Sequence, residues 1–146
     1  MRVLSLLVLF IGLVAIIMGA VFVGLGAARD AQLKEAMRIE QVKLGIESEL
    51  GDEVIDSLPE AMKAGDTIRE HRRGISATYE ELLGGGRFDA TNPQHLTYAQ
   101  AMNLENYLYL AVVAFGLTQA VMASGVFMVI TGIALGSTGI ILYRLR

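Results

Sequence analysis

The sequence predicts an all-α membrane protein, built as an antiparallel two-span transmembrane hairpin with a small helical extracytoplasmic cap. Three observations lead to this fold class. The 146-residue chain is 53% hydrophobic and has a mean hydropathy of +0.50. Two long runs without a charged side chain lie near its ends, at residues 3–28 and 106–143. Small residues recur every seven positions in both runs, and this pattern lets two helices pack closely.

The first run contains 26 residues, with Ser5 as its only hydroxyl. About 20 apolar residues in a helix cross a bilayer, so residues 1–28 are predicted as the first transmembrane helix. A cleaved signal peptide is the alternative interpretation. Because the apolar core of a signal peptide is only about 7–15 residues long, an uncleaved anchor is the preferred interpretation.

The second run is too long for one crossing. A helix over residues 106–143 would rise ~57 Å, whereas the hydrocarbon core is ~30 Å thick. A three-span chain would need a turn near Ser124, but no Pro or charge marks one there. We therefore expect one continuous helix in residues 106–146, with an interfacial collar at 106–115 and a membrane part at about 116–142.

The charged residues separate along the chain. Arg2, Arg144 and Arg146 flank the two runs, whereas residues 29–105 hold nine Lys and Arg against fifteen Asp and Glu, a net charge of −6. Basic residues tend to remain on the cytoplasmic side of a membrane. Both termini are therefore expected in the cytoplasm and residues 29–105 outside. The lack of Cys fits an exported segment and equally a reducing compartment.

The seven-residue repeat predicts a helix-packing seam. One antiparallel register pairs its members as 5/139, 12/132, 19/125 and 26/118, and chance spacing among sixteen glycines is the alternative. A GxxxG motif at Gly132 and Gly136 is weaker evidence for this seam, because such a motif is frequent in apolar helices and its alternative role is to pack a second copy of the protein. The predicted seam consists of Ser5, Gly12, Gly19, Gly26, Thr118, Gly125, Gly132 and Gly139, and Ala111 extends it.

The external segment predicts short helices. Helix formers after Ala28 extend the first helix to about Leu44, before Gly45. Ser57 and Glu60 form a capping-box pattern that opens a helix through about Arg73. The stretch ATYEELL predicts one more short helix, closed by Gly84, and NPQHL starts the returning helix, with Asn92 as its cap and Pro93 in its first turn.

The collar and the cap contain the candidate partner contacts. Tyr107 and Tyr109 suit an interfacial aromatic belt, and the aliphatic residues around them, Leu110 and Val113 included, require cover by the cap or by another subunit. Gln119 lies in an otherwise apolar stretch. Its amide is interpreted as a hydrogen bond between helices, with the lining of a narrow pore as the alternative.

Two further groups of polar residues are candidate binding sites, one for a metal ion and one for an anion. His71 and His95, with Glu70 or Asp89, could supply a two-His, one-carboxylate metal site, but nearby arginines oppose a cation, so solvated or capping histidines are preferred. His71, Arg72 and Arg73 form a positive cluster. It suits an anionic headgroup or an acidic partner, and a solvated helix face is the simpler interpretation.

Three stretches resemble a family of small bacterial membrane proteins of unassigned function. They are MRVLSLLVLFIGLVAIIMGAVF, AGDTIREHRRGISATYEELL and AVVAFGLTQAVMASGVFMVITGIAL. The resemblance spans most of the chain and implies a shared membrane fold. Some members of the family carry an automatic label of aromatic ring-opening dioxygenase. A ring-cleaving iron site needs several preorganised ligands, so neither this label nor any functional residue is carried over.

These observations predict an integral membrane structural or accessory subunit without catalytic activity. It would act through helix–helix and cap-mediated contacts with another membrane protein or with itself, and no cofactor or nucleic acid is expected. A small oligomeric pore or transporter accessory is the alternative, with Thr118, Gln119, Ser124 and Thr131 turned inward. A metal-dependent enzyme is the least favoured class.

Overall fold

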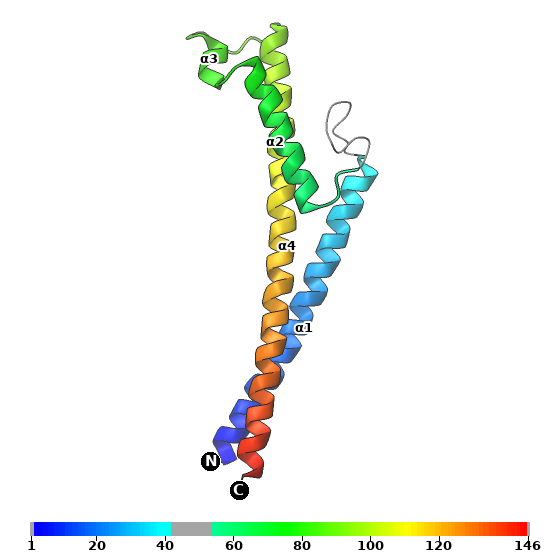
Figure 1. The fold of residues 1–146 in the computed structure, drawn as a ribbon, viewed down its shortest axis with the longest axis vertical. Helices are drawn as coiled ribbons and strands as arrows, with labels where there is room; N and C mark the ends of the chain where they lie inside the picture. The colour runs from blue at the N-terminus through cyan, green and yellow to red at the C-terminus, as the bar shows by residue number, and fades with distance from the viewer. Residues whose placement is uncertain (1, 42–53, 146) are drawn as a thin grey trace. The chain divides into compact units, whose positions relative to one another are not determined.

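The protein is described by a computed structural model that covers residues 2–41 and 54–145. Within these ranges it is all-helical and contains no strand, which confirms the predicted helical class. The elements are α1 (Arg2–Ile39), α2 (Leu58–Ile75), α3 (Tyr79–Leu83) and α4 (Pro93–Arg144), as Figure 1 shows.

The chain divides into two compact units, and both long helices contribute to each of them. The first unit consists of Met1–Gln32 and Leu117–Arg146, and the second of Leu33–Gly116. The division of α4 therefore falls between Gly116 and Leu117, so residues 106–115 belong to the second unit with α2 and α3.

In the first unit, α1 and α4 touch at the residues of the seven-residue repeat. From Arg2 to Ala28, the buried residues of α1 are Ser5, Gly12, Gly19 and Gly26. Gly12, Gly19 and Gly26 lie against the α4 backbone, where a side chain would prevent so close an approach. As the residue numbers rise along α1, the numbers of the contacting residues on α4 fall: Gly12 meets Gly132, Gly19 meets Gly125 and Gly26 meets Thr118.

The separations show how little space the seam leaves. A Cβ added to Gly12 would lie 2.8 Å from the carbonyl oxygen of Gly132, and one added to Gly19 would lie 2.5 Å from that of Gly125. A Cβ at Gly12 would also lie 2.8 Å from the backbone nitrogen of Gly136, so the GxxxG motif faces α1. A Cβ at Gly24, by contrast, would meet no atom within 4 Å. Glycine is therefore required by contact at some positions of α1 and not at others.

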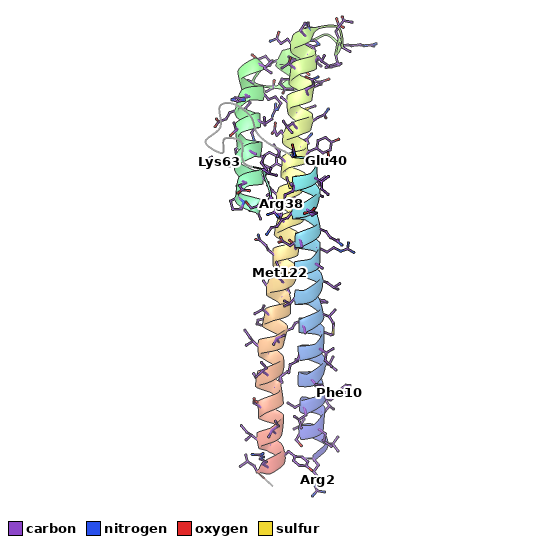
Figure 2. The ribbon with its side chains drawn as sticks, turned by 90° about the vertical axis from the view of Figure 1, so that its right-hand side faces the viewer. Arg2, Phe10, Arg38, Glu40, Lys63 and Met122 are labelled. Atoms are coloured by element: carbon purple, nitrogen blue, oxygen red, sulfur yellow. The ribbon has the colours of Figure 1, made fainter. Side chains whose placement is uncertain are left out.

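The remaining surface of the first unit is mostly apolar. Phe10 is 66% exposed and points away from α4 (Figure 2), and Phe127 and Ile130 of α4 are similarly uncovered. In the most apolar 18-residue stretches of α1 and α4, 11% and 17% of the residues are buried. Both helices are long and apolar enough to cross a membrane, judged by length and composition.

The helices of the second unit begin and end where the sequence predicts. Ser57 caps α2 by accepting a hydrogen bond from the Glu60 amide at 3.5 Å, while the Glu60 carboxylate accepts one from the Asp56 amide at 3.0 Å. This pattern is a capping box displaced by one residue. Thr78 caps α3 in the same way, and Gly84 closes that helix in the left-handed conformation at φ +56°.

The ends of the long helices require one correction. The Asn92 carboxamide oxygen accepts a hydrogen bond from the Gln94 amide at 2.9 Å, and α4 starts at Pro93 as predicted. α1 ends at Ile39 rather than near Leu44, because the chain turns at Gln41, whose φ is +48°. The remainder of the predicted extension, to Leu44, lies outside the described residues.

The core of the second unit lies where α1, α2 and α4 meet. Ala61 and Ala64 are fully buried on α2, and their small side chains bring that helix close to α4. Along α4, Leu108 and Phe115 are 2% and 1% exposed. The core of buried residues is formed by Met37, Ile55, Ala61, Ala64, Leu108 and Phe115. One side of the predicted collar therefore lies in this core.

Candidate functional site

A polar cluster connects α2 to α4 above the core of the second unit. The Arg72 guanidinium donates to both carboxylate oxygens of Glu105, at 2.6 and 3.4 Å, and to the hydroxyl of Tyr98 at 2.5 Å. Only 14% of the Arg72 side chain and 11% of the Glu105 side chain are exposed. A buried carboxylate without such a partner would be strongly unfavourable, so the two charges depend on each other.

The cluster extends along both helices through Arg69, which lies 3.5 Å from Glu105 and 2.8 Å from Asp66. The Tyr109 hydroxyl donates to the same Asp66 oxygen at 2.6 Å. Arg69 lies over the ring of Tyr109, and Arg72 lies over the ring of Tyr98, at 4.8 and 5.1 Å from the ring centroids. We refer to Tyr98, Arg72, Glu105, Arg69, Asp66 and Tyr109 as the polar ladder.

The polar ladder revises two of the predicted partner contacts. The hydrogen bond that Arg72 donates to the Glu105 carboxylate raises the pKa of Arg72, and the same bond occupies its guanidinium. Arg72 is therefore not open to an anionic headgroup, whereas its neighbours His71 and Arg73 are exposed. Tyr109 is likewise engaged by Asp66, since it lies on the α2 side of the helix, about 200° around from Tyr107.

The opposite side of α4 is open. Tyr107, Leu110 and Val113 are 71%, 64% and 65% exposed, although each is a large apolar or aromatic side chain. All three were predicted as partner contacts, and no residue of the described ranges covers them. Exposed apolar side chains grouped on one helix face are typical of interaction surfaces.

A groove lies next to this open side, within the second unit. It is formed by the end of α1 and by α4, it encloses about 570 Å³, and its lining is mostly apolar. Glu40, which Figure 2 labels near the end of α1, contributes the one carboxylate of the lining. The lining residues are Met37, Glu40, Leu104, Tyr107, Leu108 and Ala111.

His95 holds the loop before α4 in place. Its Nδ1 accepts a hydrogen bond from the Asp89 amide at 3.0 Å, its Nε2 lies 3.2 Å from the carbonyl oxygen of Leu82, and its ring stacks on Phe88. Two hydrogen bonds from Thr91 lower the pKa of the exposed Asp89. Residues 2–41 and 54–145 contain no group of three or more potential metal ligands.

Three polar residues of α4 in the first unit, Thr118, Gln119 and Ser124, have different surroundings. The Thr118 hydroxyl donates to Asp30 at 3.4 Å, across from α1. Gln119 is exposed. The Ser124 hydroxyl donates to the Ala120 carbonyl within its own helix at 2.8 Å.

Sequence reasoning missed most of the polar ladder. Glu105 is the one Asp, Glu, Lys or Arg between Pro93 and Gly116, and Tyr98 precedes it by seven residues on the same helix face. A lone charge in an otherwise uncharged helix was the available signal, because such a charge usually has a buried partner. The spacing of Asp66, Arg69 and Arg72 by three residues placed the counterparts on one side of α2.

No family model, no curated protein and no solved structure matches the chain. Its function must therefore be argued from the surfaces just described.

Removal of the Glu105 carboxylate should separate α2 from α4. Glu105→Ala leaves Arg72 buried without its counterion, and we expect a loss of about 3 kcal/mol in the free energy of unfolding, the lower end of the range for buried pairs because both side chains keep some exposure. Glu70→Ala, at an exposed position of α2, is the matched control, and its effect should stay within about 0.5 kcal/mol. Chemical unfolding of the full chain, with hydrogen exchange of the α2 amides, measures both. Equal stability of the two variants would contradict a structural role for the ladder.

Proposed function

We propose that the protein is an integral membrane accessory subunit, and that α1 and α4 form an antiparallel two-span hairpin. The observation that carries this proposal is the apolar outer surface of the first unit, where Phe10, Phe127 and Ile130 are 66%, 69% and 62% exposed. Such a surface is unfavourable in water and favourable in lipid. The antiparallel arrangement is supported by the order of the seam contacts, in which Gly12 meets Gly132 and Gly19 meets Gly125.

The orientation of this hairpin follows from charge. Arg2 and Arg144 lie at the ends of α1 and α4, and the segment between the runs is acidic. By the positive-inside tendency, both termini face the cytoplasm and the second unit lies outside.

An accessory role is supported by the open side of α4. Tyr107, Leu110 and Val113 are uncovered in the described chain, and the opposite side of the same helix is fixed by Glu105 and Tyr109 to α2. A rigid helix that presents an apolar face is suited to binding another helix. The polar ladder would then serve to hold that face in a fixed shape.

A small oligomeric pore or transporter accessory is the second candidate. It is favoured by one observation, the exposure of Gln119 on α4 in the first unit. In lipid this amide requires a hydrogen-bonding partner, which could be another helix or water in a pore.

The proposed topology predicts the position of fused reporters. A reporter joined after residue 146 should behave as cytoplasmic, and one inserted near Gly85, in the loop after α3, should behave as external. Enzymatic reporters that are active on only one side of the membrane provide the measurement. A C-terminal reporter found outside would contradict the two-span hairpin and would favour three spans with a turn near Ser124.

The accessory role predicts a complex that depends on the open side of α4. Val113→Asp places an unpaired charge in the contact, and recovery of the bound protein should fall by about tenfold or more, which corresponds to ~1.4 kcal/mol. Met62→Asp, at a position 51% exposed on α2, should leave recovery unchanged. The measurement is purification from native membranes followed by crosslinking mass spectrometry. Equal recovery with both variants would contradict the role, and a ring of copies that conducts ions would favour the pore.

A further inference from the structure

The open side of α4 contains five residues with the spacing of a helix-pairing seam. Their intervals are three, four, three and four residues, which keeps them on one face of the helix. Tyr107 and Leu110 are 71% and 64% exposed, Gln100 and Asn103 are exposed, and Ala114 is half-buried. We refer to Gln100, Asn103, Tyr107, Leu110 and Ala114 as the Tyr107 face.

None of the five residues of the Tyr107 face is charged, and Glu40 of the neighbouring groove is the one carboxylate in the lining beside Tyr107. Between Pro93 and Gly116 the single Asp, Glu, Lys or Arg is Glu105, and the polar ladder engages it with α2. The exposed side of α2 carries Glu70 and Arg73. A partner selected by opposite charge would therefore find its complement on α2 or at Glu40, and the five residues of the Tyr107 face recognise a partner by shape and by hydrogen bonds.

The chemistry of the face is complementary to itself. A carboxamide contains both a donor and an acceptor, so Asn103 and Gln100 can each pair with the same residue of another copy. An Asn at one core position of a parallel helix pair is a known means of fixing its register. Tyr107 and Leu110 would meet their own counterparts without placing like charges opposite each other.

We propose that the Tyr107 face binds the same face of a second copy, with the two α4 helices parallel around a twofold axis. This inference rests on the proposed membrane function, because two copies with one topology hold the face at the same height above the bilayer. A second copy therefore meets the face in register without adjustment, whereas an unrelated helix must be matched in depth as well as in sequence.

The Tyr107 face is too small to hold two copies together in solution, so the pairing depends on the shared orientation of the copies in the membrane. From Gln100 to Ala114 the helix rises about 21 Å, and two helices in contact over that length bury less than the ~800 Å² per partner of a stable soluble interface. Confinement to one plane with a fixed orientation lowers the entropy lost on association and raises the effective concentration. The pair should consequently be stable in membranes and weaker after dilution in detergent.

A single introduced cysteine tests the proposal, since the chain has no native thiol. In native membranes under mild oxidation, Leu110→Cys should form a disulfide-linked dimer as its main product, because two copies of this position face each other across the axis. Met62→Cys, exposed on α2, is the matched control and should remain largely monomeric. Asn103→Asp in the Leu110→Cys chain should sharply reduce the dimer through repulsion, and Asn103→Gln should preserve it.

The outcomes separate this inference from the proposed function. Equal crosslinking at Leu110→Cys and Met62→Cys, or an Asn103→Asp variant that crosslinks as well as its parent, would overturn the twofold contact. Disulfide capture of a different protein at Leu110→Cys would overturn the second copy as occupant and leave the accessory role in place. A chain that does not sediment with membranes would overturn both.

Discussion

The close approach of α1 and α4 in the first unit is the constraint on which the rest of the structure depends. Backbone meets backbone at Gly12 and Gly132 and again at Gly19 and Gly125, where an added Cβ would lie within 3 Å of a carbonyl oxygen. Glycine disfavours the helix by about 1 kcal/mol per residue relative to Ala, so these positions trade helix stability for contact. Packing of this kind does not depend on the removal of apolar surface from water. It can therefore stabilise a pair of helices that are surrounded by lipid.

The second unit is held by different physics. Its core is small and is supplemented by ion pairs of Arg72 and Arg69 with Glu105 and Asp66. If these pairs were more exposed, screening by water would weaken them. A buried ion pair adds little net stability when it forms, but removal of one partner is costly, so placements of α2 that leave Glu105 without Arg72 are disfavoured. In the proposed function this defined arrangement keeps the opposite side of α4 ready for a partner.

Much of the fold could be predicted from the sequence because its signals are local or periodic. Ser57, Gly84 and Asn92 act at helix ends through their own hydrogen bonds or conformation, and each was assigned correctly. The end of α1 was placed too late, since helix propensity does not anticipate the turn at Gln41.

The candidate site was less predictable, because its pairings join distant parts of the chain. Arg72 and Glu105 are 33 residues apart, and nothing in the local pattern links them. The same limitation affected Tyr109, which was grouped with Tyr107 by chemistry although the helix turns the two in different directions. The exposure of Leu110 and Val113 depends on where α2 lies, which no single segment of the sequence determines.

Disulfide formation within one chain tests the glycine seam most directly. The account predicts that Gly19→Cys with Gly125→Cys crosslinks within a single chain in native membranes, because the two backbones are in contact and the shift that accommodates two Cβ atoms leaves the positions in register. Gly24→Cys with Gly125→Cys should not crosslink, since Gly24 lies in open space on α1, and Gly12→Cys with Gly125→Cys is out of register by about 10 Å. Equal crosslinking of matched and mismatched pairs, or crosslinks formed only between chains, would contradict the seam and the fold built on it.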